Sequence, residues 1–175
     1  MELLERRGAR PAVHPVVWVH EAVLAQTLAA LQSFGDAEGA HEGIVYWAGR
    51  ATDTEWVVTT VIVPEAVTTR GSFRTSAAAN ARVVAHLASA DLVLLAQVHS
   101  HPGTVVDHSR GDDQGALMAY PEFLSIIVPN YGSTSLWPLD YCGVHRFEHG
   151  QFRRLPKNEV AATFRRIPML LGEAR

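Results

Sequence analysis

Two histidines separated by a single residue are the side chains of this sequence best suited to hold a metal ion. His99 and His101 follow an apolar run, and the alternation of side chains along a strand puts both imidazoles on the same side. Ser109 and Asp112 follow with the spacing of a helix N-cap and its N3 residue, which by itself predicts a capping box. Beside the two histidines, a carboxylate in the first turn of a helix can complete a His2Asp set. Three protein ligands with one open position are typical of a catalytic zinc site.

The elements that must position these residues alternate between strands and helices. The apolar run over 91–98 predicts a central strand covered on both faces, and a polar loop over 101–108 leads to a short helix from Ser109 to near Tyr120. Hydrophobic periodicity, capping residues and breakers predict the other elements: an edge strand over 16–19, strands over 39–49, 55–63, 123–128, 135–147 and 151–155, and helices over 20–34, 77–88 and 156–166.

This order of elements predicts an α/β fold, with a single mixed β-sheet flanked by helices in three α-β-α layers. The length of 175 residues suits one domain. We expect it to span 16–175, after a mobile N-terminal lead-in over 1–15 that carries arginines, a glycine and prolines.

Composition excludes several classes of function. The formal net charge is −3, whereas proteins that bind duplex DNA or anionic membranes normally carry a basic face. We therefore expect no nucleic-acid or membrane partner. The single cysteine, Cys142, cannot form an internal disulfide or a Cys-rich zinc site, and we expect it to be a small buried residue. No apolar run approaches the length of a spanning helix and no targeting segment is evident, so we expect a cytoplasmic protein.

The spacing of the site residues resembles a known motif. His99-x-His101-Pro102, six intervening residues, and then Ser109-x-x-Asp112 is similar to the JAMM motif of the JAB/MPN+ metalloprotease family. The resemblance covers roughly residues 16–155 and implies the JAB/MPN, cytidine-deaminase-like fold.

That family also has a glutamate on an early strand, usually seven residues before a glycine. Glu42 precedes Gly49 by this interval. The sequence departs from the family pattern at Val45, where a glycine is expected three residues after the glutamate. Glu38 is the competing candidate, although it lacks the spacing.

The resemblance implies a role for each of these residues. His99, His101 and Asp112 would bind one zinc ion per chain, with water as the fourth ligand. Glu42 would accept the proton of that water and pass it to the leaving amine, and Ser109 would donate a hydrogen bond to the developing oxyanion. The implied activity is that of a zinc isopeptidase or peptidase that cleaves after the C-terminal glycine of a ubiquitin-like protein.

The chain resembles bacterial stand-alone members of this family, because the stretches over 63–76 and 113–136 are short. We therefore expect no second metal. The expected partner is a ubiquitin-like protein or its conjugate, with activating and conjugating enzymes of the same pathway. Two alternatives stay open: a zinc hydrolase of small amides or peptide conjugates, and a non-catalytic binding module that holds zinc for structure.

Three residues beside the motif are further candidates for metal ligands. Asp113 follows Asp112, but one residue along a helix turns a side chain by about 100°, so only one of the two is expected to bind. Asp107 and His108 are expected to lie in a solvated loop rather than to contact metal or substrate.

Overall fold

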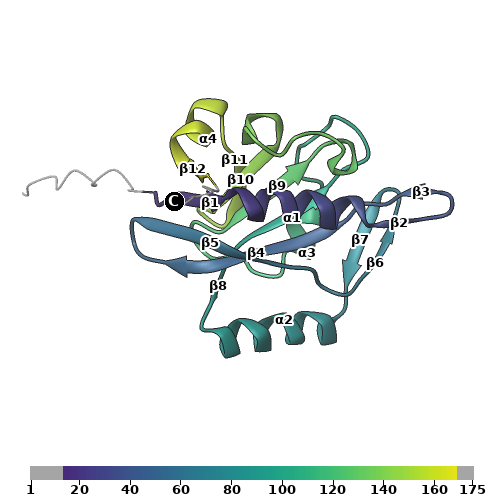
Figure 1. Ribbon diagram of the computed structural model, residues 1–175, viewed down its shortest axis with the longest axis horizontal. Coiled ribbons are helices and arrows are strands. Elements are labelled where there is room, and N and C mark those ends of the chain that lie inside the picture. The colour runs from purple at the N-terminus through teal and green to yellow at the C-terminus, as the bar shows by residue number, and fades with distance from the viewer. Residues whose placement is uncertain (1–13, 169–175) are drawn as a thin grey trace, which may run out of the picture.

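A mixed eight-stranded sheet forms the centre of the computed structural model, which describes residues 14–168 (Figure 1). The strand order is β11-β10-β9-β8-β4-β5-β1-β12. Strand β8 lies in the interior of the sheet, antiparallel to β4 and parallel to β9. The bounds of the strands are β1 Val16–His20, β4 Ile44–Ala51, β5 Glu55–Ile62, β8 Val93–Ser100, β9 Leu124–Val128, β10 Gly143–Glu148, β11 Gln151–Arg154 and β12 Phe164–Ile167.

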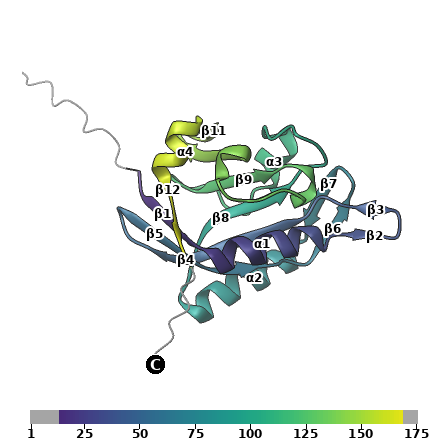
Figure 2. The same cartoon turned by 45° about the horizontal axis from the view of Figure 1, so that its top comes forward.

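Helices cover both faces of this sheet, and alternation along β4 explains why. Val45 and Trp47 pack in one hydrophobic cluster with side chains of α1 (Glu21–Gln32) and α4 (Lys157–Thr163). Ile44 and Tyr46 point to the opposite face and pack with side chains of α2 (Ala77–Ala90). Figure 1 shows α1 and α2 on opposite sides of the sheet, and Figure 2 shows the same arrangement turned by 45°. Both faces of β4 are therefore buried, and the predicted three-layer α/β fold is confirmed.

Smaller elements extend from one end of this sheet. Two hairpins lie there, β2–β3 (Gly35–Asp36 and Gly39–Ala40) and β6–β7 (Ala66–Thr69 and Ser72–Thr75), with β6 and β7 beside α3 in Figure 1. Helix α3 (Arg110–Gly115) follows β8, and two 3-10 turns span Asn130–Gly132 and Leu139–Tyr141. No helix within residues 14–168 is both long and apolar enough to cross a bilayer.

The predictions at the two ends of the chain need correction. The final helix ends at Thr163, and the next residues form β12 instead of continuing as a helix to 166. Strand β12 runs parallel to β1, with Val17 opposite Phe164. As a result, the strand predicted at the edge, β1, is paired on both sides, with β5 and β12.

Three internal boundaries also differ from the prediction. The strand predicted over 39–49 is two strands, β3 and β4. The strand predicted over 135–147 begins only at Gly143, because Pro138, which has no N–H for a ladder, leads into a 3-10 turn. Helix α3 ends at Gly115, well before Tyr120.

Most of the predicted N-terminal lead-in, and residues 169–175 of the predicted domain, lie outside the described residues. At the inner end of the lead-in, the His14 imidazole lies 2.9 Å from the carboxylate of Glu122. That end of the chain therefore contacts the domain.

Candidate active site

The end of β8 is fixed from both sides, and this fixes the two histidines. On the β4 side, the Ser100 N–H donates to the carbonyl of Gly43 at 3.0 Å, and the Gly43 N–H donates to Ser100 Oγ at 2.9 Å. On the β9 side, the His101 N–H donates to the carbonyl of Val128 at 2.9 Å. His99 is completely buried, whereas His101 is partly open to a pocket.

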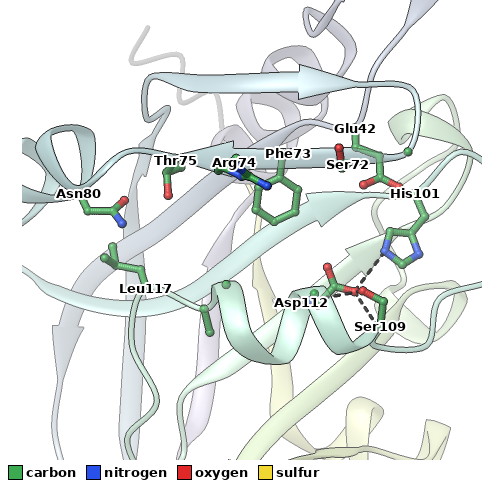
Figure 3. Close-up of a pocket in the computed structure, with 14 residues that line it drawn as sticks. Glu42, Ser72, Phe73, Arg74, Thr75, Asn80, His101, Ser109, Asp112 and Leu117 are labelled. Atoms are coloured by element: carbon green, nitrogen blue, oxygen red, sulfur yellow. Dashed lines mark hydrogen bonds and ion pairs between the residues drawn. The ribbon is translucent and has the colours of Figure 1, made fainter.

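Asp112 reaches the same point from α3, which begins with the capping box that the spacing predicts. Asp112 Oδ2 accepts a hydrogen bond from the Ser109 N–H at 2.7 Å, and Ser109 Oγ accepts one from the Asp112 N–H at 3.2 Å. The carboxylate also faces the two histidines, with Oδ1 3.3 Å from His99 Nε2 and Oδ2 3.6 Å from His101 Nε2. Figure 3 shows Asp112 pointing toward His101. Asp112 therefore caps its helix and faces the two imidazoles at once.

The three side chains have the spacing of metal ligands. The Nε2 atoms of His99 and His101 lie 3.3 Å apart. Nitrogens bound at about 2.0–2.1 Å to a tetrahedral zinc ion would lie about 3.3 Å from each other. His101 Nδ1 lies 3.0 Å from the carbonyl oxygen of Val105. A proton on that nitrogen leaves the Nε2 lone pair directed at the shared point. Two imidazole nitrogens and a carboxylate oxygen thus make a donor set that suits zinc.

Glu42 faces these donors across the pocket (Figure 3). It immediately precedes Gly43, which is bonded to the end of β8, and its own N–H donates to the carbonyl of Thr69 at 2.8 Å. The residue is only 7% exposed. By contrast, the side chain of Glu38 is 83% exposed and lies 3.6 Å from Arg70. The structure therefore brings Glu42, and not Glu38, to the predicted site.

Burial sets the electrostatics of the carboxylates. Burial raises the pKa of Glu42; the neighbouring charge of His101 opposes this shift and that of Asp112 adds to it. Burial also opposes ionisation of Asp112, but hydrogen bonds from His101 and His99 hold its pKa well below the usual range. Asp112 is thus held as a carboxylate, while Glu42 has a proton affinity above that of an ordinary glutamate.

The pocket has a volume of about 690 Å³. Glu42, His101, Ser109 and Asp112 line one part of it. The other part is bordered by β7, by the start of α2 and by the segment after α3 (Figure 3). His99 lies behind its partners, in contact with the ring of Phe73 at 5.1 Å between centroids.

Comparison with known proteins agrees with this geometry. Residues 24–140 match the sequence model of a family described as prokaryotic homologues of the JAB domain. The chain belongs to this family. A protein of Sinorhizobium fredii named "Probable metalloprotease y4jG" is 33% identical over 124 residues, which cover 66% of this JAB-domain chain and 70% of the relative.

A solved structure shares the fold of this JAB domain. The solution structure of a Desulfitobacterium hafniense protein superposes with a TM-score of 0.62 at 15% identity, covering 89% of this chain and 95% of that one. A JAB1/MPN domain protein from Archaeoglobus fulgidus is 18% identical, with a TM-score of 0.45 over 81% of this chain and 96% of that one.

One feature of this JAB domain differs from the sequence prediction. The prediction of a solvated loop is wrong for His108, whose side chain is only 6% exposed. Its Nδ1 lies 2.7 Å from Asp113 Oδ1 and its Nε2 lies 2.8 Å from Ser125 Oγ on β9. Its ring lies 4.2 Å from that of His145 on β10. His108 therefore joins α3 to the sheet that carries His99, through a partner adjacent to Asp112.

No local pattern marks this role, because Ser125 and His145 belong to distant strands. The neighbouring Asp107 does lie at the surface as predicted, where it pairs with Arg154.

Proposed function

We propose that this JAB domain is a zinc-dependent peptidase or isopeptidase that hydrolyses the bond after the C-terminal glycine of a ubiquitin-like protein. The family and the relative named as a metalloprotease support a metallopeptidase-like hydrolase. One observation supports placing this activity here: His99, His101 and Asp112 converge beside an open pocket, opposite a buried Glu42. The resemblance of the motif supports the ubiquitin-like substrate, with activating and conjugating enzymes of the same pathway as further partners.

His99, His101 and Asp112 would hold the zinc ion, which when bound polarises a carbonyl and lowers the pKa of a coordinated water toward about 7. The pocket that the three residues border leaves room for substrate next to their donor atoms.

Glu42 supplies the proton transfers. Its carboxylate faces the donors from the opposite wall, and burial raises its pKa. The carboxylate therefore accepts a proton more readily than that of an ordinary glutamate. A base of this kind accepts the proton of the attacking water and then donates it to the leaving amine.

Ser109 supplies a hydrogen bond to the carbonyl oxygen as negative charge develops there. Its Oγ accepts from the Asp112 N–H, so the hydroxyl proton is available to a ligand in the pocket. A donor already held in place needs little reorganisation when the charge forms.

A hydrolase of small amides or peptide conjugates is the second candidate. The pocket volume of about 690 Å³ lies in the range of small-ligand sites, which favours this candidate. The same residues would perform the same steps.

Cleavage assays with zinc-loaded protein test the proposal. The substrates are a ubiquitin-like protein joined through its terminal glycine to a lysine side chain, and a short peptide amide with the same terminal residues. We expect Glu42→Gln to keep zinc but to lower turnover by about 100- to 10,000-fold, while Glu38→Gln retains full activity. Cleavage of the short amide alone would favour the second candidate. If the zinc-loaded wild type cleaves neither substrate, the proposed function is wrong.

A further inference from the structure

One cationic side chain in the described part of the chain has no partner, and it lies in the pocket. The Arg74 side chain makes no hydrogen bond, ion pair or ring contact, whereas every other lysine or arginine side chain described within residues 14–168 contacts a carboxylate, a carbonyl oxygen or an aromatic ring. For example, Arg70 on the same hairpin approaches Glu38, and Arg50 on β4 pairs with Asp91. Among the basic side chains that the structure describes, Arg74 is thus the one left free to bind a ligand.

The surroundings of Arg74 favour an anion. Arg74 projects from β7 in the part of the pocket beyond the metal-binding residues (Figure 3). The carboxylates that line the pocket, Glu42 and Asp112, belong to the other part, and both are engaged in the proposed chemistry. The pocket wall next to Arg74 therefore carries a positive charge with no acidic neighbour among its lining residues.

A second polar group in this part of the pocket is also free. Asn80, in the first turn of α2, lines the pocket, and its amide oxygen is buried without a hydrogen-bond partner among the protein atoms described. Its amide has no hydrogen bond within the described protein that would prevent it from turning its NH2 group to a ligand. A guanidinium and an amide NH2 on one wall both suit carboxylate oxygens.

We propose that Arg74, assisted by Asn80, is a specificity-determining residue that binds a carboxylate of the substrate in the pocket beyond the metal-binding residues. The inference rests on the proposed function and adds a substrate class to it: conjugates with a carboxylate close to the scissile bond. Two chemical sources supply such a group. One is an acidic side chain in the acyl segment, and the other is the free α-carboxylate of a leaving amino acid.

Matched substrates separate these sources. Fluorescent peptides that end in two glycines are prepared as two pairs: one pair carries Asp or Asn next to the glycines, and the other releases an amino acid or its amide. We expect wild type to prefer the charged member of one pair by about tenfold in kcat/KM, and that pair identifies the source.

Variants of Arg74 link the preference to this side chain. Arg74→Gln should abolish it. Arg74→Glu should reverse it, so that the neutral member is cleaved faster. Arg50→Gln, an exposed arginine that pairs with Asp91 and does not line the pocket, should keep the wild-type preference. Equal cleavage within both pairs by wild type, or a preference that survives Arg74→Gln, would overturn the inference.

A binding measurement keeps this test separate from that of the proposed function. The same labelled peptides are titrated by fluorescence anisotropy against zinc-loaded Glu42→Gln, with and without Arg74→Gln. Loss of the affinity difference between charged and neutral peptides on Arg74→Gln supports the inference even where wild type cleaves none of them. An affinity difference of zero in both proteins counts against it.

Discussion

Two adjacent aspartates at the start of α3 allow a test in which the same chemical change is expected to weaken zinc binding at one position and to leave it nearly unchanged at the other. Asp112→Asn and Asp113→Asn each exchange one carboxylate oxygen for an amide NH2. Asp112 Oδ1 lies 3.3 Å from His99 Nε2, so its replacement removes one of three ligands and the only negative charge among them. Asparagine keeps one oxygen that can accept the Ser109 N–H, so α3 retains its cap.

The expected magnitude follows from the place of each residue. Loss of a group that merely supports a metal ligand costs about 10- to 100-fold in affinity. Loss of the ligand Asp112 should therefore weaken zinc binding by at least about 100-fold, or about 2.7 kcal/mol. Asp113 faces His108 instead, with Oδ1 2.7 Å from Nδ1. Because asparagine also accepts a hydrogen bond there, Asp113→Asn should bind zinc nearly as tightly as wild type.

Competition with a chromophoric chelator at neutral pH gives the zinc affinity of both variants and of wild type. Thermal unfolding of the metal-free proteins checks that both variants fold. Equal losses of affinity in two folded variants, or a larger loss for Asp113→Asn, would show that Asp112 is not the third ligand.

Three further predictions concern the metal, the thiol and pH. The double variant His99→Ala/His101→Ala should contain no stoichiometric zinc by elemental analysis, because it retains only one of three donors. Cys142→Ser should stay active, and alkylating reagents should leave the wild type active, because the Cys142 thiol is buried and its burial raises the pKa to about 12. A chelator, by contrast, should abolish cleavage. His145 should make the fold sensitive to acid: burial, reinforced by the charge of His108, lowers its pKa to about 4 from the ordinary histidine value of about 6.5. The unfolded chain therefore binds more protons there between these values, so the free energy of unfolding falls as the pH drops through this window, by up to about 3 kcal/mol. His145→Gln should reduce that fall in urea unfolding compared between neutral pH and about pH 5, and an unchanged fall would contradict the assignment.

The parts of the site that the sequence predicts are those set by local geometry. Alternation along a strand places His99 and His101 on one side, and the spacing of Ser109 and Asp112 specifies the first turn of a helix. Both patterns span a few residues, so backbone periodicity alone determines which side chains share a face. The placement of Glu42 came from the family spacing to Gly49, at which β4 has an irregularity in its pairing.

The features that the sequence does not predict depend on partners far along the chain. Strand β12 forms beside β1, from the other end of the domain, and its segment also fits a helical pattern. His108 owes its burial to Ser125 and to the ring of His145. The local composition of the 101–108 loop carries no signal for either contact, because polar loops are usually solvated.

A six-residue helix such as α3 needs external contacts, because isolated helices of this length are not stable in water. Its first turn receives them on two sides. Asp112 joins the capping box and faces the end of β8, while Asp113, turned by about 100°, engages His108, which in turn bonds to β9. Neither His108 nor Asp113 needs a metal ion to make these contacts. The helix is therefore held against the sheet by groups distinct from the proposed metal ligands, and these contacts help to orient the carboxylate of Asp112 toward the histidines. A third ligand held in this way would add little ordering cost to metal binding.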